Sequence, residues 1–406
     1  MSFIDIHCHP ALKTWIFPKQ HVYNSAHPIN LRFSERIFMN LPNMKAGQLN
    51  AAVSVYYLPE ANIETDLLSR YFTGQLDILL EAVCRNRLHQ ILEDKSSPDA
   101  SFAQIVSYIT MFENDIKYAA DNGFETAVAH SLNEFNQYSS LGKIVFLHSI
   151  EGAHCLGNGN VDATTILQRI DTLFDMGICQ FTLAHFFENI LVSSQGGIPP
   201  KVRKLMHYDT ANTYANGYNT RDNIAVQAVD HLLEKGIIID LVHCTEGAKS
   251  MVYARNEMRG ANKRPLVFSH TGIRSVVLKY SPQFTYPDAL YLPGDDDILK
   301  IKDCNGVLGI IFMDYWLNGT ETVSNAADVV IESIEYVARI CGNYDNIAIG
   351  SDLDGFTEVP RDLAGPDKIP YLIQKMHDKG IAQADIDKIC FGNYMRVLAG
   401  GWGKAM

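Results

Sequence analysis

The apolar positions of this chain fall into short, nearly continuous runs that alternate with longer segments of helical periodicity. Such runs are typical of parallel strands covered on both faces, because βαβ crossovers place helices on either side of the sheet. The first run begins almost at Met1 and is closed by Pro10, and the second is ended by Pro59. We predict eight strands, at residues 4–10, 51–57, 143–150, 178–184, 237–242, 265–269, 306–312 and 347–351.

Segments with apolar residues at positions i, i+3 and i+4 separate the predicted strands. Between Pro59 and Gly142 the chain is mostly helical and longer than one crossover needs, which predicts an elaborated helical layer. Residues 11–45, residues 193–219 and the stretch up to Pro293 are predicted to be loops, the first with a short helix. We predict helices at residues 63–92, 101–120, 164–176, 221–235, 246–259, 325–340, 371–379 and 385–398.

Strands that alternate with helices predict an α/β protein, and eight such strands predict a (β/α)8 TIM-type barrel with the elaborated helical layer on its outside. A doubly wound sheet is the alternative. No internal repeat, low-complexity tract or linker interrupts the series, so we expect residues 1–406 to form one domain.

Composition and charge narrow the class of partner. The chain is 47% hydrophobic and 20% charged, which is ordinary for a globular protein. Its formal net charge of -12, without a basic stripe, argues against nucleic acid, since phosphate binding depends on Lys and Arg. The first strand begins by about Phe3, and no apolar run approaches the ~20 residues of a membrane span, so we expect a cytoplasmic protein without a membrane partner. Eight scattered cysteines without a C-x-x-C pair indicate neither a disulfide framework nor a thiolate zinc site.

Polar side chains follow six of the eight predicted strands, at the point where each strand ends. In a (β/α)8 barrel these ends share one face, on which active sites are built. Strand periodicity also places His7 and His9 on the same face of the first strand. Fourteen histidines could supply one or two such coincidences, but a random scatter would not fill six strand ends. The candidates are His7, His9, Glu151, His185, His243, His270, Asp352 and Asp354.

Imidazole nitrogen with carboxylate oxygen and no thiolate is the ligand set of Zn²⁺, or a similar first-row ion, in a hydrolytic site. Two ions could be bound, one by His7, His9 and Glu151. The other would be held by His243, His270 and the same Glu151, with a bridging hydroxide between ions ~3.5–4 Å apart. Asp352 would then be available as the proton shuttle.

Short motifs along nearly the whole chain resemble the renal, or membrane, dipeptidase family of the amidohydrolase superfamily. They lie at residues 5–9, 45–50, 54–56, 150–154, 181–185, 217–220, 240–243, 268–270, 350–355 and 392–396. The resemblance implies a zinc-dependent (β/α)8 barrel that hydrolyses dipeptides and often tolerates a D-residue on the C-terminal side.

The same resemblance implies a role for each matching residue. His7, the position of His9 and Glu151 would bind the first zinc, and Glu151, His243 and His270 the second. His185 would contact the substrate carbonyl, Asp352 would be the acid and base, and Tyr218 would help bind the substrate. It also implies a homodimer with a small-molecule substrate.

Two departures from the family pattern concern the metal and the substrate. The strand-one motif is usually His-x-Asp, whereas His9 stands at the second position here, so the first site loses one negative charge. After His270 the family commonly carries an arginine that grips the substrate carboxylate, and residues 280–288 contain none. Arg274 is the nearest candidate for that role.

Three functions remain open at this point. The first is a metallo-dipeptidase, and the second is an amidohydrolase that acts on an N-acyl amino acid, a cyclic amide or a lactone. The third is a non-catalytic metal-binding barrel, and the presence of Asp352 argues against it, because a scaffold needs no acid or base at that strand end.

Overall fold

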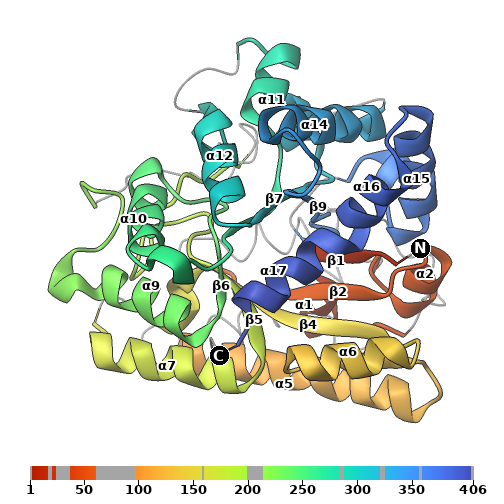
Figure 1. Cartoon of the computed structure of the whole chain (residues 1–406). Helices are drawn as coiled ribbons and strands as arrows, with labels where there is room; N and C mark the ends of the chain where they lie inside the picture. The colour runs from red at the N-terminus through yellow and green to blue at the C-terminus, as the bar shows by residue number, and fades with distance from the viewer. Residues whose placement is uncertain are drawn as a thin grey trace, which may run out of the picture.

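A single sheet of parallel strands forms the centre of the molecule (Figure 1). The computed structural model describes residues 2–16, 21–23, 37–60, 97, 99–157, 160–198, 214–283, 288–320, 325–355 and 359–403. The strands follow the order β1-β2-β4-β5-β6-β7-β8-β9, and β3 pairs with β4 off this path. Their bounds are β1 Ile4–Cys8, β2 Ala51–Tyr57, β3 Thr126–Val128, β4 Ile144–Glu151, β5 Ile178–Thr182, β6 Ile238–Asp240, β7 Val267–Thr271, β8 Val307–Ile310 and β9 Ile347–Ile349.

The first and last strands meet just beyond their ends and nearly close the sheet into a barrel. The backbone N–H of Asp352 donates to the His7 carbonyl at 2.8 Å, and the N–H of His9 donates to the Leu353 carbonyl at 2.8 Å. The buried Asp5 carboxylate adds a second tie, because it accepts the backbone N–H of Ser351 at 3.0 Å. The predicted eight-stranded barrel is therefore confirmed.

Helices surround the strands on the outside (Figure 1). Among the described residues, none of these helices combines the length and the apolar character needed to cross a bilayer. Their bounds are α1 Pro10–Ile16, α2 Leu41–Ala46, α5 Ala100–Asp121, α6 Leu132–Ser140, α7 Ala163–Asp175, α9 Ile224–Lys235, α10 Glu246–Glu257, α11 Arg274–Tyr280, α12 Asp295–Asp303, α13 Asp314–Asn318, α14 Ala326–Cys341, α15 Ile369–Asp378, α16 Gln383–Asp387 and α17 Asn393–Gly401.

Strand alternation divides the apolar core into two layers. On β4, Val145 and Leu147 belong to the cluster inside the barrel, whereas Phe146 and Ile150 belong to the cluster under the helices. Helix α17 completes the inner cluster with side chains that include Val397. This alternation matters for the site, because it directs Glu151 into the barrel together with the odd-numbered residues of β4.

Several segments differ from the predictions. The helix predicted from Ile63 to Leu92 lies outside the described residues. The predicted helix over 385–398 is interrupted, since a π-helical turn at Lys388–Gly392 separates α16 from α17. The stretch up to Pro293, predicted to be a loop, contains α11 and a 3₁₀ turn at Asp288–Tyr291, so that prediction is wrong there. Strand β3 and helices α6 and α12 were not predicted individually.

Close backbone packing at the start of β8 gives a test of the barrel. A Cβ at Gly306 would lie 1.9 Å from the carbonyl oxygen of Leu266 in the neighbouring strand segment, so Gly306→Ala must push two backbones apart. We expect the free energy of unfolding to fall by ~1–3 kcal/mol, the usual scale of overpacking. Equilibrium urea unfolding measures it.

Gly392→Ala is the matched control, because the nearest atom to a Cβ at Gly392 lies 3.7 Å away and its φ of -61° is helical. Alanine there should be neutral or stabilise by up to ~1 kcal/mol. Equal unfolding midpoints for the two variants would contradict the packing described here.

Candidate metal centre

The carboxylate of Glu151 lies at the centre of a ring of histidines. Glu151 ends β4 and its side chain is 3% exposed. The five histidines come from four separate strand ends of the barrel, those of β1, β5, β6 and β7. Their Nε2 atoms lie 3.5 Å (His7), 3.7 Å (His243) and 3.5 Å (His270) from Oε1, and 3.5 Å (His9) and 3.8 Å (His185) from Oε2.

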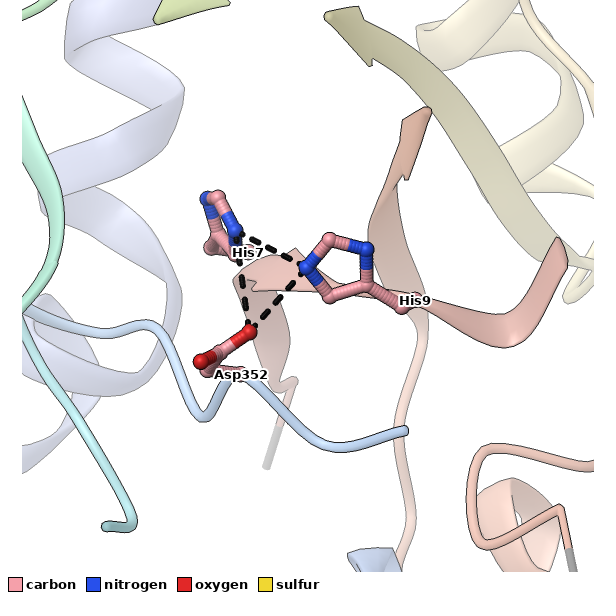
Figure 2. Close-up of side chains that lie close together, drawn as sticks. All are labelled: His7, His9 and Asp352. Carbon is pink, nitrogen blue, oxygen red and sulfur yellow. Dashed lines mark hydrogen bonds and ion pairs between the residues drawn. The ribbon is translucent and has the colours of Figure 1, made fainter. Parts of the chain in front are cut away.

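Asp352 joins this ring from the segment after β9. Figure 2 shows His7 and His9 from the β1 segment converging with Asp352. Asp352 Oδ1 lies 3.0 Å from His9 Nε2 and 3.9 Å from His7 Nε2, and the two imidazole nitrogens are 3.3 Å apart. Three potential ligand atoms therefore face one another across the closure of the barrel.

Hydrogen bonds to Nδ1 orient two of the metal-ligand candidates. The Ser269 hydroxyl lies 2.7 Å from His7 Nδ1 and donates to Asp240 Oδ2 at 2.5 Å, so it is placed to accept the Nδ1–H of His7. His243 Nδ1 lies 2.6 Å from the Gly196 carbonyl, to which it donates. A proton held on Nδ1 leaves the Nε2 lone pair toward Glu151, which is the tautomer that binds a metal.

His185 is held by a different partner, the buried carboxylate of Glu60. Glu60 Oε2 lies 3.2 Å from His185 Nδ1 and accepts the Tyr57 hydroxyl at 2.8 Å. Glu60 Oε1 accepts the backbone N–H groups of Phe186 and Phe187, at 2.9 and 3.1 Å. Burial opposes ionisation of Glu60, but His185 holds its pKa below the usual range.

Three residues at this end of the barrel adopt left-handed backbone conformations, with φ of 62° at His243, 58° at Asp352 and 66° at Asp354. Such conformations cost on the order of 1–3 kcal/mol each and persist where the surrounding structure imposes them. Gly355 makes room for the side chains of Asp352 and His9, because a Cβ there would lie 2.4 Å from Asp352 Oδ1 and 2.9 Å from His9 Cδ2.

Asp354 is held by one cation and two backbone N–H groups. It accepts Lys13 Nζ at 2.9 Å and the backbone N–H groups of Phe38 and Met39, at 3.0 and 2.8 Å. These bonds fasten the end of β9 to α1 and to the segment before α2. Asp354 therefore has a structural role, and Asp352 is the carboxylate turned toward the histidines.

The charge state of the centre suits cation binding. Burial works against ionisation of Glu151, but His185 and His7 hold the pKa of its carboxyl well below the usual range. Burial, aided by His7, lowers the pKa of His270 well below its ordinary value, so that imidazole is neutral and has a lone pair to donate. A neutral imidazole beside an ionised carboxylate is a divalent-cation site.

Unsatisfied polar atoms point to the same conclusion. Glu151 Oε1 and His9 Nδ1 are buried, and neither has a hydrogen-bond partner among the described residues. The neighbouring Cys8 thiol donates to the Val53 carbonyl and does not join the ring of histidines. Burial raises the pKa of this thiol well above the ordinary value. The residues present therefore fit metal ions bound through nitrogen and oxygen.

Arg274 and Tyr218, the predicted substrate-binding residues, are not among the groups brought to Glu151. Arg274 begins α11, and its Nε donates to the Leu292 carbonyl at 3.0 Å. Its Nη2 donates to Glu246 Oε1 at 3.2 Å. Tyr218 is half-buried and forms an isolated antiparallel bridge with Val192. Their roles toward a substrate stay predictions.

Sequence reasoning missed four supporting residues: Glu60, Asp240, Ser269 and Trp316. Glu60 follows β2 as a carboxylate at a strand end, so the positional rule that identified the other candidates could have found it. The Trp316 ring packs on His270, with centroids 5.7 Å apart and planes 21° apart, and Nε1 donates to the Gly197 carbonyl at 2.9 Å. Nothing in the sequence indicates that contact.

Known proteins resemble this chain in fold or in sequence. A metallopeptidase from Rhodobacter sphaeroides, solved with a phosphinate mimic of the dipeptide L-Ala-D-Ala, superposes with a TM-score of 0.69 at 15% identity and covers 99% of both chains. The dipeptidase aclJ of Aspergillus oryzae is 24% identical over 263 residues, 65% of this chain and 53% of its own. The dipeptidase tcpJ of Claviceps purpurea is 26% identical over 271 residues, 67% of this chain and 54% of its own.

The chain thus spans about half the length of these curated relatives. The likeness to the solved metallopeptidase supports the barrel, since at 15% identity it carries the fold alone. The sequence profile of the membrane dipeptidases, peptidase family M19, matches residues 1–400. This chain therefore belongs to the membrane dipeptidase family.

Proposed function

We propose that this protein is a metal-dependent dipeptidase that binds two divalent ions, zinc by preference, with Glu151 shared between them. The observation that supports the proposal is the position of Glu151, whose carboxylate lies within 3.5–3.8 Å of five imidazole nitrogens. Oε1 faces His243 and His270, and Oε2 faces His9. His7 Nε2 lies 3.5 Å from Oε1 but only 3.3 Å from His9 Nε2, so it can share an ion with His9. His7 and His9 would complete one site. His243 and His270 would complete the other.

The residues around the centre have distinct tasks in amide hydrolysis. When bound, the ions supply Lewis acidity, which acidifies a water and polarises a carbonyl. Ser269 and Gly196 hold the imidazoles of His7 and His243 in the ligating tautomer, as the hydrogen bonds to Nδ1 indicate. Trp316 and the buried β-strand ends keep bulk water away from the carboxylate of Glu151.

Asp352 is the proton carrier in this proposal. Its side chain is 12% exposed, more than that of Glu151 at 3%, so it lies on the accessible side of the centre. Its Oδ1 lies 3.0 Å from His9 Nε2, so a water bound beside this pair would be within reach of the carboxylate and could give up a proton to it. The same carboxyl would return the proton to the leaving amine.

His185 would stabilise the negative charge that develops on the scissile carbonyl oxygen. Glu60 accepts its Nδ1–H, which fixes the ring so that Nε2 faces the centre, 3.8 Å from Glu151 Oε2. In this orientation a proton on Nε2 would be donated to the oxygen. A donor positioned in advance acts on the transition state more than on the ground state.

Dipeptides with a D-residue at the C-terminal side are the proposed substrates. The related metallopeptidase from Rhodobacter sphaeroides was solved with a mimic of L-Ala-D-Ala, which supports this class of substrate. The contacts of Arg274 favour a second candidate, an amide without a free carboxylate, because this guanidinium already donates to Leu292 O and Glu246. A single domain, a homodimer and a cytoplasmic location stay predictions from the sequence.

Replacing Asp352 by Asn tests the proton-carrying role. Asp352→Asn keeps the size of the side chain but removes its basicity, so turnover of a dipeptide should fall ~100-fold or more. Metal content should stay at the wild-type value, as measured by elemental analysis on the same preparation. Asp354→Asn is unsuitable as a control, because it would weaken the tie to Lys13.

Glu332→Gln is a better control, because this carboxylate pairs with Lys279 and Tyr280 away from the centre, and activity should be unchanged. His185→Ala should resemble Asp352→Asn and also weaken inhibitor binding. Loss of metal in Asp352→Asn, combined with full activity in His185→Ala, would show that the two roles are assigned wrongly.

The contacts of Arg274 predict that the protein binds the carboxylate of a substrate only weakly. A charge-assisted hydrogen bond contributes ~1.5–3 kcal/mol, which corresponds to roughly 10- to 150-fold in kcat/KM. We therefore expect a dipeptide and its C-terminal amide to differ in kcat/KM by less than about 10-fold. Matched free-acid and amide substrates, assayed with wild type and Arg274→Ala, measure this ratio.

A ratio above about 100 that Arg274→Ala leaves unchanged would show that another group reads the carboxylate. A ratio of that size that collapses in Arg274→Ala would instead assign the task to Arg274. Either result would contradict the weak discrimination expected here and favour a strict dipeptidase.

A further inference from the structure

A second cluster of ligand-type side chains lies on the outside of the barrel and belongs to no part of the centre described above. It consists of Glu113, His130 and His148. Glu113 Oε1 lies 2.8 Å from His130 Nε2 and 3.0 Å from His148 Nε2, and the three ligand atoms all lie within 4.8 Å of one another. Two imidazole nitrogens therefore converge on one carboxylate oxygen.

Strand alternation separates this cluster from the catalytic centre. His148 precedes Glu151 by three positions on β4, so the two side chains point to opposite faces of the strand. Glu151 points into the barrel, and His148 points outward under α5, where its side chain is completely buried. A ligand held by His148 cannot also touch Glu151.

The edge strand β3 brings His130 to this place. Its register pairs Val128 with Phe146, and the next residue continues the ladder, because Ala129 N donates to the Phe146 carbonyl at 3.0 Å. His130 therefore arrives beside His148, with ring centroids 5.7 Å apart. Gly177 packs against it so closely that a Cβ there would lie 2.8 Å from His130 Cδ2.

Both imidazoles have a partner on the nitrogen that faces away from Glu113. The Tyr56 hydroxyl lies 2.7 Å from His148 Nδ1, and Glu134 Oε2 lies 3.4 Å from His130 Nδ1. Glu134 also accepts the backbone N–H of His130 at 2.9 Å. A partner on Nδ1 that can accept a proton is the arrangement that holds metal-binding histidines with Nε2 toward the ion.

The carboxylate of the cluster is ionised at neutral pH. Partial burial opposes this, but hydrogen bonds from His130 and His148 lower the pKa of Glu113 to about 2. Glu113 can therefore act as a ligand without first losing a proton. The cluster differs from an ordinary surface ion pair in the complete burial of His148.

We propose that Glu113, His130 and His148 form a third metal site, which binds a first-row divalent ion such as Zn²⁺ through two imidazole nitrogens and one carboxylate oxygen. Ligand atoms around a tetrahedral zinc are about 3.3 Å apart, so the distances of 2.8 and 3.0 Å to Glu113 need to open only slightly. The ion takes the place of the proton on each Nε2. His130 Nδ1–H then donates a hydrogen bond to Glu134, and His148 Nδ1–H donates one to the Tyr56 oxygen. Water fills the fourth position, on the side where His130 is exposed.

Such an ion would connect three separate elements, since Glu113 is on α5, His130 follows β3 and His148 is on β4. Figure 1 shows α5 and α6 along the same side of the sheet as β4. The site would therefore fasten the helical layer to the edge of the barrel. The ion would stabilise the fold, and the activity of the dipeptidase centre should not depend on it.

The test compares zinc uptake by four proteins that already hold their catalytic metals: wild type, His130→Ala, Glu113→Gln and His231→Ala. His231 is the matched control, because it also pairs with a carboxylate, Asp171 at 2.7 Å, but shares it with Lys235 in place of a second histidine. Equilibrium dialysis against zinc, followed by elemental analysis, gives the number of ions per chain. Zinc-dependent melting temperature gives a second readout.

Wild type and His231→Ala should bind one more zinc per chain than His130→Ala and Glu113→Gln, and only the first two should gain melting temperature with zinc. Dipeptide kcat/KM should agree within about twofold across all four. Equal zinc content in wild type and His130→Ala would overturn the proposal. Equal loss in His231→Ala would also overturn it, because it would assign the uptake to surface histidines in general.

Discussion

A carboxylate buried at the mouth of a nearly closed barrel imposes the main constraint on this structure. An ionised side chain removed from water is very costly unless charges or hydrogen-bond donors surround it, and breaking such a pairing costs several kcal/mol. Glu151 is surrounded by five imidazoles from four strand ends that are far apart in the sequence. These imidazoles approach only if all eight barrel strands hold their positions.

Closure of the barrel is therefore part of the site. The backbone bonds from Asp352 to His7 and from His9 to Leu353 tie β1 to the segment after β9, and they place two ligand candidates beside Asp352, the proposed proton carrier. The buried Asp5 supports this seam through Ser351. Burial raises the pKa of Asp5 to about 6 although Ser351 opposes the shift, so desolvation at the seam is the larger effect.

The buried Asp240 supports the opposite side of the centre. Its carboxylate accepts the hydroxyls of Thr182 and Ser269, each at 2.5 Å, and the backbone N–H of Ser269 at 2.9 Å. Through Ser269 it fixes the orientation of His7, which lies on a strand at the other end of the sequence. A layer of this kind determines which nitrogen carries the proton, and so whether the ring can bind an ion.

Structural features that depend on repeated local patterns were predictable from the sequence. Short apolar runs predicted the barrel strands, and their ends predicted the ring around Glu151. Strand β3 has three residues, too few for a period, so neither the strand nor the approach of His130 to His148 was predicted. Helix α12 was not predicted either. Its first three residues, Asp295, Asp296 and Asp297, resemble a polar loop, although acidic residues favour a helix N-terminus. Contacts such as Trp316 on His270 depend on tertiary packing, which no local pattern contains.

The sharing of Glu151 by two ions is the central claim, and anomalous diffraction from crystals grown with zinc tests it most directly. The account predicts two strong peaks at the barrel mouth, ~3.5–4 Å apart. Each peak should lie about 2.0–2.2 Å from a different oxygen of Glu151. A single peak, or two peaks bound by the histidines with Glu151 out of coordination range of either, would contradict it.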